Sequence, residues 1–253
     1  MATVTDRQLK SIPGWFGPSD WGLFRFSLDE STRQMGTGDL AELGAYLGKS
    51  AVLIGEYVKP GETFTVLDLF GASAETAGNA AENEEQYPEL TRARFEENYL
   101  RVHDELPSVV QAPSSQVLQH ATHNTHRFIH VDASHLYDQV VQDVRASQLL
   151  LQPQGMVVFD DYRMFHAAGV SAAVWEALRD GLNPIAMTRK KLYATWGDPK
   201  PWVASLEAWI STSKLDHIVE SIAGRAVYRT WIRPNRIVGV LQELDRRRRS
   251  GAR

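Results

Sequence analysis

Residues 127–162, RFIHVDASHLYDQVVQDVRASQLLLQPQGMVVFDDY, contain the pattern that decides the fold. Two short runs rich in β-branched and aromatic residues, 127–133 and 155–162, are typical of buried strands. The longer stretch between them, 136–153, is typical of a helix. A strand, a helix and a second strand in this order predict two parallel strands that are joined across a helix.

The same alternation of strands and helices extends in both directions from this unit. The further elements, in the order strand, helix, strand, helix, strand, helix and a closing strand pair, are expected at 39–45, 50–58, 63–70, 91–106, 108–114, 169–182 and 184–196. We therefore predict an α/β fold with a Rossmann-like, doubly wound and mostly parallel sheet and with helices on both faces. Ligands of such sheets bind at the carboxyl ends of the strands.

The length of 253 residues suits a single substantial domain. We assign residues 36–253 to this domain, and residues 1–35 to an N-terminal segment that packs on the core or forms a lid. Within that segment, the Pro-, Gly- and Trp-rich stretch 11–24 predicts irregular structure, and 27–35 predicts a helix. The long polar stretch at about 71–90 predicts a loop or cap.

Composition limits the location and the partners of the protein. The absence of cysteine excludes disulfides and thiolate metal sites and fits a reducing cytoplasm, where we expect the protein to reside. The formal net charge of −4 argues against nucleic acid as the main partner. No signal-peptide pattern is present, and no apolar run approaches the roughly 20 residues that span a bilayer. The Trp- and Pro-rich ends favour a homodimer, and the basic tail 246–253 is interpreted as a solvated end.

The first strand-to-helix turn, ELGAYLGKS, begins at Glu42, ends at Ser50 and lacks the G-x-G-x-x-G pattern that seats a pyrophosphate. Gly44 and Gly48 allow the backbone to turn tightly and to approach a ligand. Glu42 would repel a phosphate but suits an ammonium group. Asp68, near the end of the next strand, has the position from which a carboxylate accepts both hydroxyl hydrogens of a ribose. The alternative is structural: glycines that only form the turn, and an aspartate that caps a loop.

Three carboxylates follow two strands that the alternation makes neighbours. Asp132 ends the earlier of these strands, and Asp160 and Asp161 end the later one. Adjacent strands lie about 4.8 Å apart, so the three side chains can converge on one point. Three anions together require a cation, or a raised pKa that keeps one group protonated. Oxygen-only ligands favour Mg²⁺ or Mn²⁺. The alternative is that Asp160 caps the following helix while Asp161 faces water.

The histidines receive different interpretations. His135, in the loop after the fourth strand, is close enough to reach the same pocket, where a neutral imidazole is a natural general base for a hydroxyl group. His166 follows the acidic pair and is a candidate for the substrate pocket. A third set is spaced three residues apart and lacks a companion ligand, which favours a solvated loop over a zinc site: His120, His123 and His126.

Four stretches of the chain, DLAELGAYLGKSAVL, VLDLF, RFIHVDASHLYDQV and GMVVFDDY, together resemble the class I S-adenosylmethionine-dependent methyltransferases. The resemblance covers roughly residues 36–200, and it points to the metal-dependent branch that O-methylates sugars, such as the macrolide-sugar O-methyltransferases. It implies methyl transfer from S-adenosylmethionine to a hydroxyl of a small-molecule or oligosaccharide substrate. The 1-hydroxyl of a methylated mannoside in polysaccharide biosynthesis is one such acceptor.

The resemblance also implies a role for each matched residue. Glu42 and Gly44 would lie beside the methionine part of the cofactor, Asp68 would hold its ribose, and Ser114 would lie near the adenine. His135 matches the position of the family's base. The divalent ion, Mg²⁺ or Mn²⁺, would be ligated by Asp132, Asp160 and Asp161.

Other functions remain open on the sequence. The extended stretch 71–90 departs from the compact turn that is typical of the family after the second strand, which leaves the lid and the substrate pocket undefined. A related O-methyltransferase of catechols or other phenols is one alternative, although a histidine base suits an alcohol of high pKa. A nicotinamide-dependent Rossmann oxidoreductase predicts a glycine-rich pyrophosphate turn, which ELGAYLGKS lacks. A non-catalytic module would tolerate the loss of His135.

Overall fold

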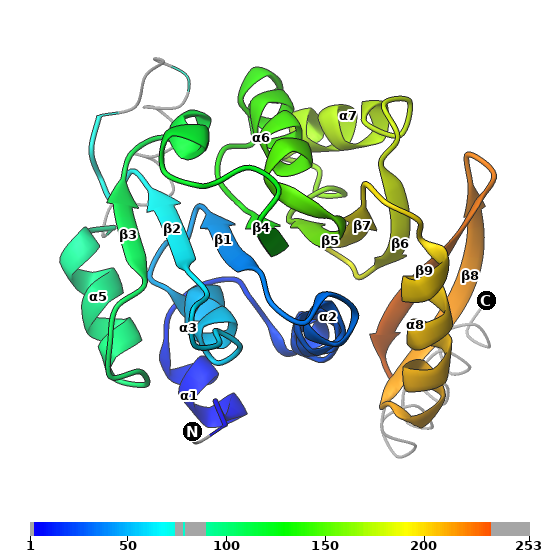
Figure 1. Ribbon diagram of the computed structural model, residues 1–253, viewed down its shortest axis with the longest axis horizontal. Coiled ribbons are helices and arrows are strands. Elements are labelled where there is room, and N and C mark those ends of the chain that lie inside the picture. Colours follow the sequence, from blue (N-terminus) through cyan, green and yellow to red (C-terminus); the bar gives the residue numbers. More distant parts are fainter. Residues whose placement is uncertain (1–2, 74–77, 79–89, 234–253) are drawn as a thin grey trace, which may run out of the picture.

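The structure is a computed structural model that describes residues 3–73, 78 and 90–233 (Figure 1). These residues form one nine-stranded sheet in the order β3-β2-β1-β4-β5-β7-β6-β9-β8, with helices on both faces. The predicted Rossmann-like, mostly parallel α/β fold is therefore confirmed. Most of the predicted loop at 71–90 and all of the basic tail 246–253 lie outside the described residues.

Five strands form the parallel half of the sheet. In sheet order they are β3 (Ser108–Gln111), β2 (Phe64–Asp68), β1 (Asp39–Leu43), β4 (His126–Val131) and β5 (Leu151–Phe159). Leu43, Val131 and Phe159 lie side by side in the register of the sheet, so β1, β4 and β5 end at one level. The residues that follow these strands consequently meet at one edge of the sheet.

The other half of the sheet has mixed directions. In sheet order its strands are β7 (Leu192–Thr195), β6 (Asn183–Met187), β9 (Arg225–Ile232) and β8 (Leu215–Ile222). β7 runs antiparallel to both β5 and β6, β9 is parallel to β6, and β8 is antiparallel to β9. The strand pair predicted at 184–196 is confirmed as β6 and β7. The β8–β9 hairpin and the helix before it lie beyond the predicted elements.

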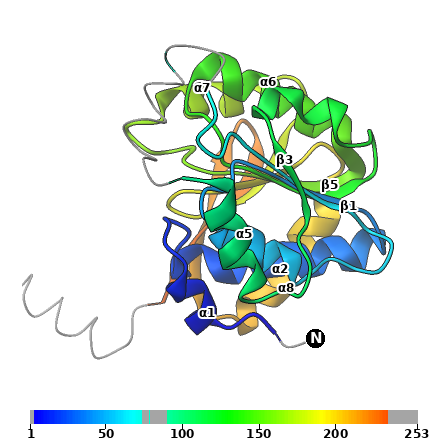
Figure 2. The same cartoon turned by 90° about the vertical axis from the view of Figure 1, so that its left-hand side faces the viewer.

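Helices cover the sheet in two layers, which Figure 2 shows edge-on. One layer contains α1 (Asp6–Ser11), α2 (Pro18–Met35), α3 (Lys49–Gly55), α5 (Arg92–Leu100) and α8 (Lys200–Thr212). The other contains the 3₁₀ helix η1 (Ser114–Gln119), α6 (Tyr137–Leu150) and α7 (Ala168–Glu176). Each layer buries its own apolar cluster against one face of the sheet. None of the described helices is both long enough and apolar enough to cross a membrane.

The N-terminal segment differs from the prediction of an irregular stretch at 11–24. Pro18–Met35 is one continuous helix, α2, of which the predicted helix at 27–35 is only the second half. Proline is favoured in the first turn of a helix, where its missing N–H would have no partner. Trp21 and Phe24 are buried, and α2 packs on β4 and β5, so apolar burial outweighs the cost of Gly22 inside the helix.

Asp143 is a buried acid on the inner side of α6. Its residue exposure is 1%, and neither carboxyl oxygen forms a hydrogen bond of good geometry with any residue that the structure describes. Burial raises the pKa of Asp143 to about 7, and the nearby Ser114 hydroxyl offsets only part of this effect. The folded protein therefore holds this proton more tightly than the unfolded chain does.

Replacement of Asp143 by Asn should stabilise the fold increasingly as the pH rises. Between about pH 4 and pH 7 the folded state binds more protons at this site than the unfolded state, so the wild-type free energy of unfolding falls as the pH rises and levels off above about pH 7. Asn is uncharged at every pH and avoids this loss, which amounts to at most about 4 kcal/mol. Urea unfolding at pH 5 and pH 8 measures the effect. The exposed Asp138→Asn on the same helix should follow the wild-type curve. An Asp143→Asn variant that also follows the wild-type curve would contradict the prediction.

Candidate functional site

A cavity lies at the carboxyl edge of the parallel strands. One residue at or just after the end of each of four strands lines it: Gly44, Asp68, Asp132 and Asp160. Ser114, the first residue of η1, and His135, in the loop after β4, line it as well. Ser50, Asp161 and His166 also line it. Most of the predicted site residues are thus brought to one place, and the position agrees with the rule for ligands of parallel sheets.

Gly44 is required by the close approach of two strand ends. Its φ is +78°, and a Cβ atom built on it would lie 2.1 Å from the carbonyl oxygen of Asp132 and 2.6 Å from the Cα atom of Ala133. The Gly44 N–H donates to the Leu67 carbonyl at 2.8 Å. Only glycine fits here, and its bare backbone faces the cavity.

Asp68 organises the turn after β1 through its carboxylate. Oδ2 accepts hydrogen bonds from the backbone N–H groups of Ala45 at 2.8 Å and Tyr46 at 2.9 Å, and Oδ1 accepts one from Phe70 at 2.7 Å. Burial raises the pKa of Asp68, and these three hydrogen bonds oppose the increase. Asp68 lines the cavity, but backbone N–H groups use most of the acceptor capacity of its carboxylate.

Two of the predicted cofactor residues do not line this cavity. Glu42 is fully buried, and its Oε1 lies 2.7 Å from Nδ1 of His130. Gly48, with a φ of +88°, precedes α3, and a Cβ atom there would lie 3.0 Å from the Phe95 ring. The glycine is therefore explained by helix packing. Residues of the N-terminal segment line the cavity instead, among them Trp15, whose ring centroid lies 5.1 Å from that of Tyr46.

A buried ammonium group lies directly beneath the acidic edge. Nζ of Lys191 is 2.6 Å from Oδ2 of Asp160 and 2.8 Å from Nε2 of His130, and Lys191, like His130, has no exposed surface. Burial alone would lower the pKa of Lys191, but the carboxylates of Asp160, Asp132 and Asp20 raise it above its ordinary value. The lysine therefore stays charged, and despite its burial Asp160 has a lowered pKa because of Lys191.

The hydrogen bonds of this group have a fixed direction. A lysine ammonium only donates, so Nε2 of His130 accepts from Lys191 and its Nδ1–H donates to Glu42. Burial and the charge of Lys191 lower the pKa of His130, which agrees with a neutral imidazole. Neither His130, which lies within the predicted strand 127–133, nor Lys191 was predicted as part of the site. Lys191 belongs to a run of basic residues, a pattern that ordinarily indicates a solvated surface.

Asp161 faces a second set of side chains. Its Oδ2 lies 3.3 Å from Nε2 of His135 and 3.6 Å from Nε2 of His166, and its Oδ1 lies 3.3 Å from Nζ of Lys190. Burial opposes ionisation, but the hydrogen bond to His135 and the charge of Lys190 hold the pKa of Asp161 below its ordinary value. His166 lines the cavity too.

The three predicted metal ligands divide between two groups of donor atoms. Asp132 and Asp160 cluster with His130, whereas Asp161 clusters with His135 and His166. Burial and the neighbouring Asp160 raise the pKa of Asp132 well above its ordinary value, which is the behaviour of a carboxylate with insufficient positive charge nearby. The donor chemistry of this edge therefore fits a divalent cation.

The spaced histidines do not form such a site. His120 and His123 are exposed, while His126 is buried as the first residue of β4. They are absent from the groups of donor atoms that could hold a metal ion in the described part of the chain. His120 and His123 lie in exposed positions, as expected for a solvated loop, whereas His126 belongs to the strand.

Comparisons with known proteins agree with this geometry. Residues 41–162 match the family model of a methyltransferase domain, and the match includes the strand ends at Gly44, Asp132 and Asp160. The chain is an S-adenosylmethionine-dependent methyltransferase. No curated protein sequence shows significant similarity to it.

Solved structures share the fold of this methyltransferase at low identity. The O-methyltransferase NovP is 20% identical with a TM-score of 0.56, and the alignment covers 70% of this chain and 79% of NovP. A protein of Corynebacterium glutamicum is 15% identical with a TM-score of 0.50, over 78% of this chain and 92% of that protein. The calicheamicin methyltransferase CalS11 is 16% identical with a TM-score of 0.50, over 70% and 79%. At these identities the comparisons establish the fold alone.

Replacement of Lys191 by Met should destabilise the methyltransferase far more than the same change at the adjacent Lys190. Met keeps much of the side-chain volume, but it leaves the buried carboxylate of Asp160 without its cation, which typically costs about 3–5 kcal/mol. Lys190 is one-quarter exposed, and removal of its pair with Asp161 should cost less than about 1 kcal/mol. Chemical unfolding of both variants at pH 7 measures the difference. Equal losses would show that the Lys191–Asp160 pair contributes no more than a surface contact.

Proposed function

We propose that the enzyme transfers the methyl group of S-adenosylmethionine to a hydroxyl group of a sugar, with the 1-hydroxyl of a methylated mannoside as the specific candidate. The observation that carries this proposal is the convergence of a carboxylate-paired histidine, His135, and three acids on the cavity where the cofactor of this fold binds. The fold similarity to NovP, itself an O-methyltransferase, supports oxygen as the acceptor atom.

The cofactor would occupy the part of the cavity between the ends of β1 and β2. Gly44 offers a backbone without a side chain for the methionine part, and Asp68 retains acceptor capacity for a ribose hydroxyl. Ser114 lines the same cavity at the start of η1, where the adenine would lie. Glu42 would act indirectly, because its carboxylate is fully buried and accepts a hydrogen bond from His130.

His135 would remove the proton of the acceptor hydroxyl. Its Nε2 lies 3.3 Å from Oδ2 of Asp161, so the carboxylate orients the imidazole and stabilises the imidazolium that forms. The deprotonated oxygen would then attack the methyl carbon of the sulfonium, and S-adenosylhomocysteine would leave. Because the methyl group is already activated in the cofactor, correct placement of the two reactants would supply much of the rate acceleration.

A divalent ion, Mg²⁺ or Mn²⁺, would be held by Asp132 and Asp160, with Asp161 as a third ligand from the neighbouring group of donor atoms. When bound, such an ion lowers the pKa of a hydroxyl that it contacts and orients neighbouring substrate oxygens. The raised pKa of Asp132, caused by burial and by Asp160, supports a need for further positive charge at this edge. Lys191 already neutralises one of the buried carboxylates from the protein side.

A catechol or other phenol is the second candidate acceptor, because its adjacent hydroxyl groups suit the same acids. The two candidates are separated by incubation with S-adenosylmethionine, Mg²⁺ and either partly methylated mannosides or catechol, with mass spectrometry of the products. We expect a methylated mannoside. Methylation of catechol alone would replace the sugar assignment, and a product methylated on nitrogen or carbon would overturn O-methylation.

Replacement of His135 by Ala should lower turnover by about 10²–10⁴-fold, the usual contribution of a general base. Binding of S-adenosylmethionine, measured by calorimetry, should remain unchanged because the cofactor would lie on the β1 and β2 side of the cavity. The exposed His123→Ala serves as the matched control and should retain full activity. Retained full activity in His135→Ala would exclude this residue as the base.

Removal of divalent ions should abolish methyl transfer reversibly. After EDTA treatment and desalting, activity should be restored by titration with Mg²⁺ or Mn²⁺, since the acids alone leave Asp132 without sufficient positive charge. Asp132→Asn should weaken the apparent metal affinity in the same titration. A rate that EDTA leaves unchanged would remove the metal from the proposed reaction.

A further inference from the structure

A second hollow lies beside the methyl-transfer cavity, and no predicted site residue lines it. We call it the arginine groove; its volume is about 400 Å³, which is in the range of small-molecule sites. It is lined by Arg163, Met164, Phe165, Thr188, Arg189, Arg229, Thr230 and Trp231. Three separate elements contribute these residues: the loop after β5, the turn between β6 and β7, and β9.

The groove is strongly basic in a protein whose net charge is −4. Three of its lining residues are arginines, and no acidic residue of the described chain lines it. Arg229 pairs with Glu220 at 3.1 Å across the β8–β9 hairpin, whereas Arg163 and Arg189 have exposed side chains. Guanidinium groups bind phosphate through pairs of parallel hydrogen bonds, so this lining selects an anion, and a phosphate ester above all.

Two aromatic rings border the same groove. Phe165 is 92% exposed and Trp231 is 39% exposed, so both offer uncovered faces to a ligand. An exposed aromatic face stacks on a planar base or on the apolar face of a sugar. The groove therefore combines anion binding with a surface for the organic part of the same molecule.

The groove and the methyl-transfer cavity share their walls. Along the loop after β5, Asp161 and His166 line the cavity, while the intervening Arg163 and Phe165 line the groove. In the β6–β7 turn, Arg189 lines the groove and the next residue, Lys190, lines the cavity. Phe159, Met187 and Arg229 lie at one level in the register of the sheet, and β5, β6 and β9 run in the same direction, so the two spaces are neighbours along the same sheet edge. An extended ligand at this edge can contact the walls of both.

We infer that the arginine groove binds a phosphate group of the acceptor while its hydroxyl lies at His135. This inference rests on the proposed sugar methylation and narrows its substrate class to phosphorylated sugars, whether simple sugar phosphates or nucleotide-linked sugars. In a nucleotide-linked sugar the 1-oxygen carries the phosphate, so the methylated hydroxyl would be a different one from the 1-hydroxyl of the mannoside candidate. The phosphate is bound by Arg163, Arg189 and Arg229, and the ring attached to it stacks on Phe165 or Trp231.

Calorimetric titration of the 253-residue enzyme tests this inference without turnover. Pyrophosphate, uridine diphosphate and uridine are the probes, with S-adenosylhomocysteine bound and with EDTA present, so that no divalent ion bridges the probe to the acids. We expect both phosphates to bind and uridine to bind at least about tenfold more weakly, because charge-assisted hydrogen bonds dominate the contact. Tighter binding of uridine diphosphate than of pyrophosphate would assign a nucleotide-linked sugar, and equal binding a simple sugar phosphate.

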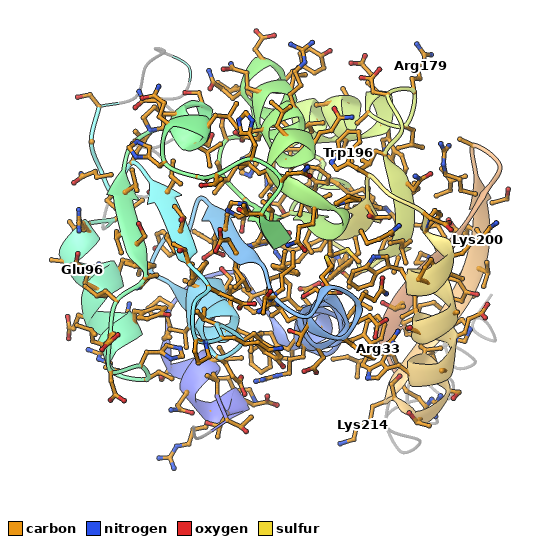
Figure 3. All side chains as sticks on the ribbon, in the orientation of Figure 1. Arg33, Glu96, Arg179, Trp196, Lys200 and Lys214 are labelled. Atoms are coloured by element: carbon orange, nitrogen blue, oxygen red, sulfur yellow. The ribbon has the colours of Figure 1, made fainter. Side chains whose placement is uncertain are left out.

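The double variant Arg163→Gln/Arg189→Gln removes two exposed charges of the groove and leaves the Arg229–Glu220 pair intact. Both phosphates should bind at least about tenfold more weakly, with an unchanged melting temperature and unchanged affinity for S-adenosylhomocysteine. The matched control is Arg179→Gln, an exposed arginine outside both linings that Figure 3 shows at the edge of the molecule. Phe165→Ala should weaken the binding of uridine diphosphate more than that of pyrophosphate if the uracil ring stacks on Phe165.

The inference is overturned if neither phosphate binds, if the double variant binds both as the wild type does, or if Arg179→Gln weakens them equally. The last result would indicate non-specific attraction to basic side chains. These outcomes leave methyl transfer to neutral mannosides untouched. Conversely, the wild-type enzyme could bind phosphate, lose this binding in the double variant, and yet methylate no sugar. That result would refute the proposed acceptor but establish the anion site.

Discussion

The buried pair of Lys191 and Asp160 is the interaction on which the acidic edge depends. Two charges without solvent cost several kcal/mol unless each has a close partner, and here Nζ and Oδ2 are 2.6 Å apart. The antiparallel direction of β7 makes this contact possible. Leu192 pairs with Phe159, so Lys191, just before β7, lies beside Asp160, just after β5. A parallel strand in that place would present its other end and leave the carboxylate alone.

The same ammonium group orders the strands on the other side. Glu42 and His130 are paired in the register of β1 and β4, and Lys191 donates to His130, which donates to Glu42. One line of hydrogen bonds therefore runs from the residue before β7 through β4 to β1. Helix α2 contributes to the same centre, because Asp20 raises the pKa of Lys191 and Phe24 packs against the His130 ring. The N-terminal segment is consequently part of the core beneath the site.

The fold and the acidic edge could be predicted from local sequence patterns. Contacts between residues far apart in the sequence could not. Alternating strands and helices specify a parallel sheet, and aligned strand ends bring Asp132 and Asp160 together. The residue types of each segment and the order of strands and helices are therefore enough to predict this part of the structure. The partner of Asp160 lies 31 residues away in a basic run, and nothing local distinguishes Lys191, which is buried, from Lys190, which is one-quarter exposed. Helix α2 was not predicted because of its Pro, Gly and Trp residues. Pro18 is exposed and tolerated because it lies in the first turn of the helix, whereas Trp21 is accommodated by burial in the core.

The two adjacent aspartates are not duplicates, and the backbone explains why. The Asp161 N–H donates to Oδ1 of Asp160 at 2.8 Å, and Asp161 itself has a φ of +50°, a left-handed conformation that aspartate tolerates better than most residues. This local reversal turns the second carboxylate away from Lys191 and toward His135. One acid is thereby committed to the buried cation and the other to a titratable partner in the cavity. A chain with a single aspartate here could supply either the partner of Lys191 or the partner of His135, but not both.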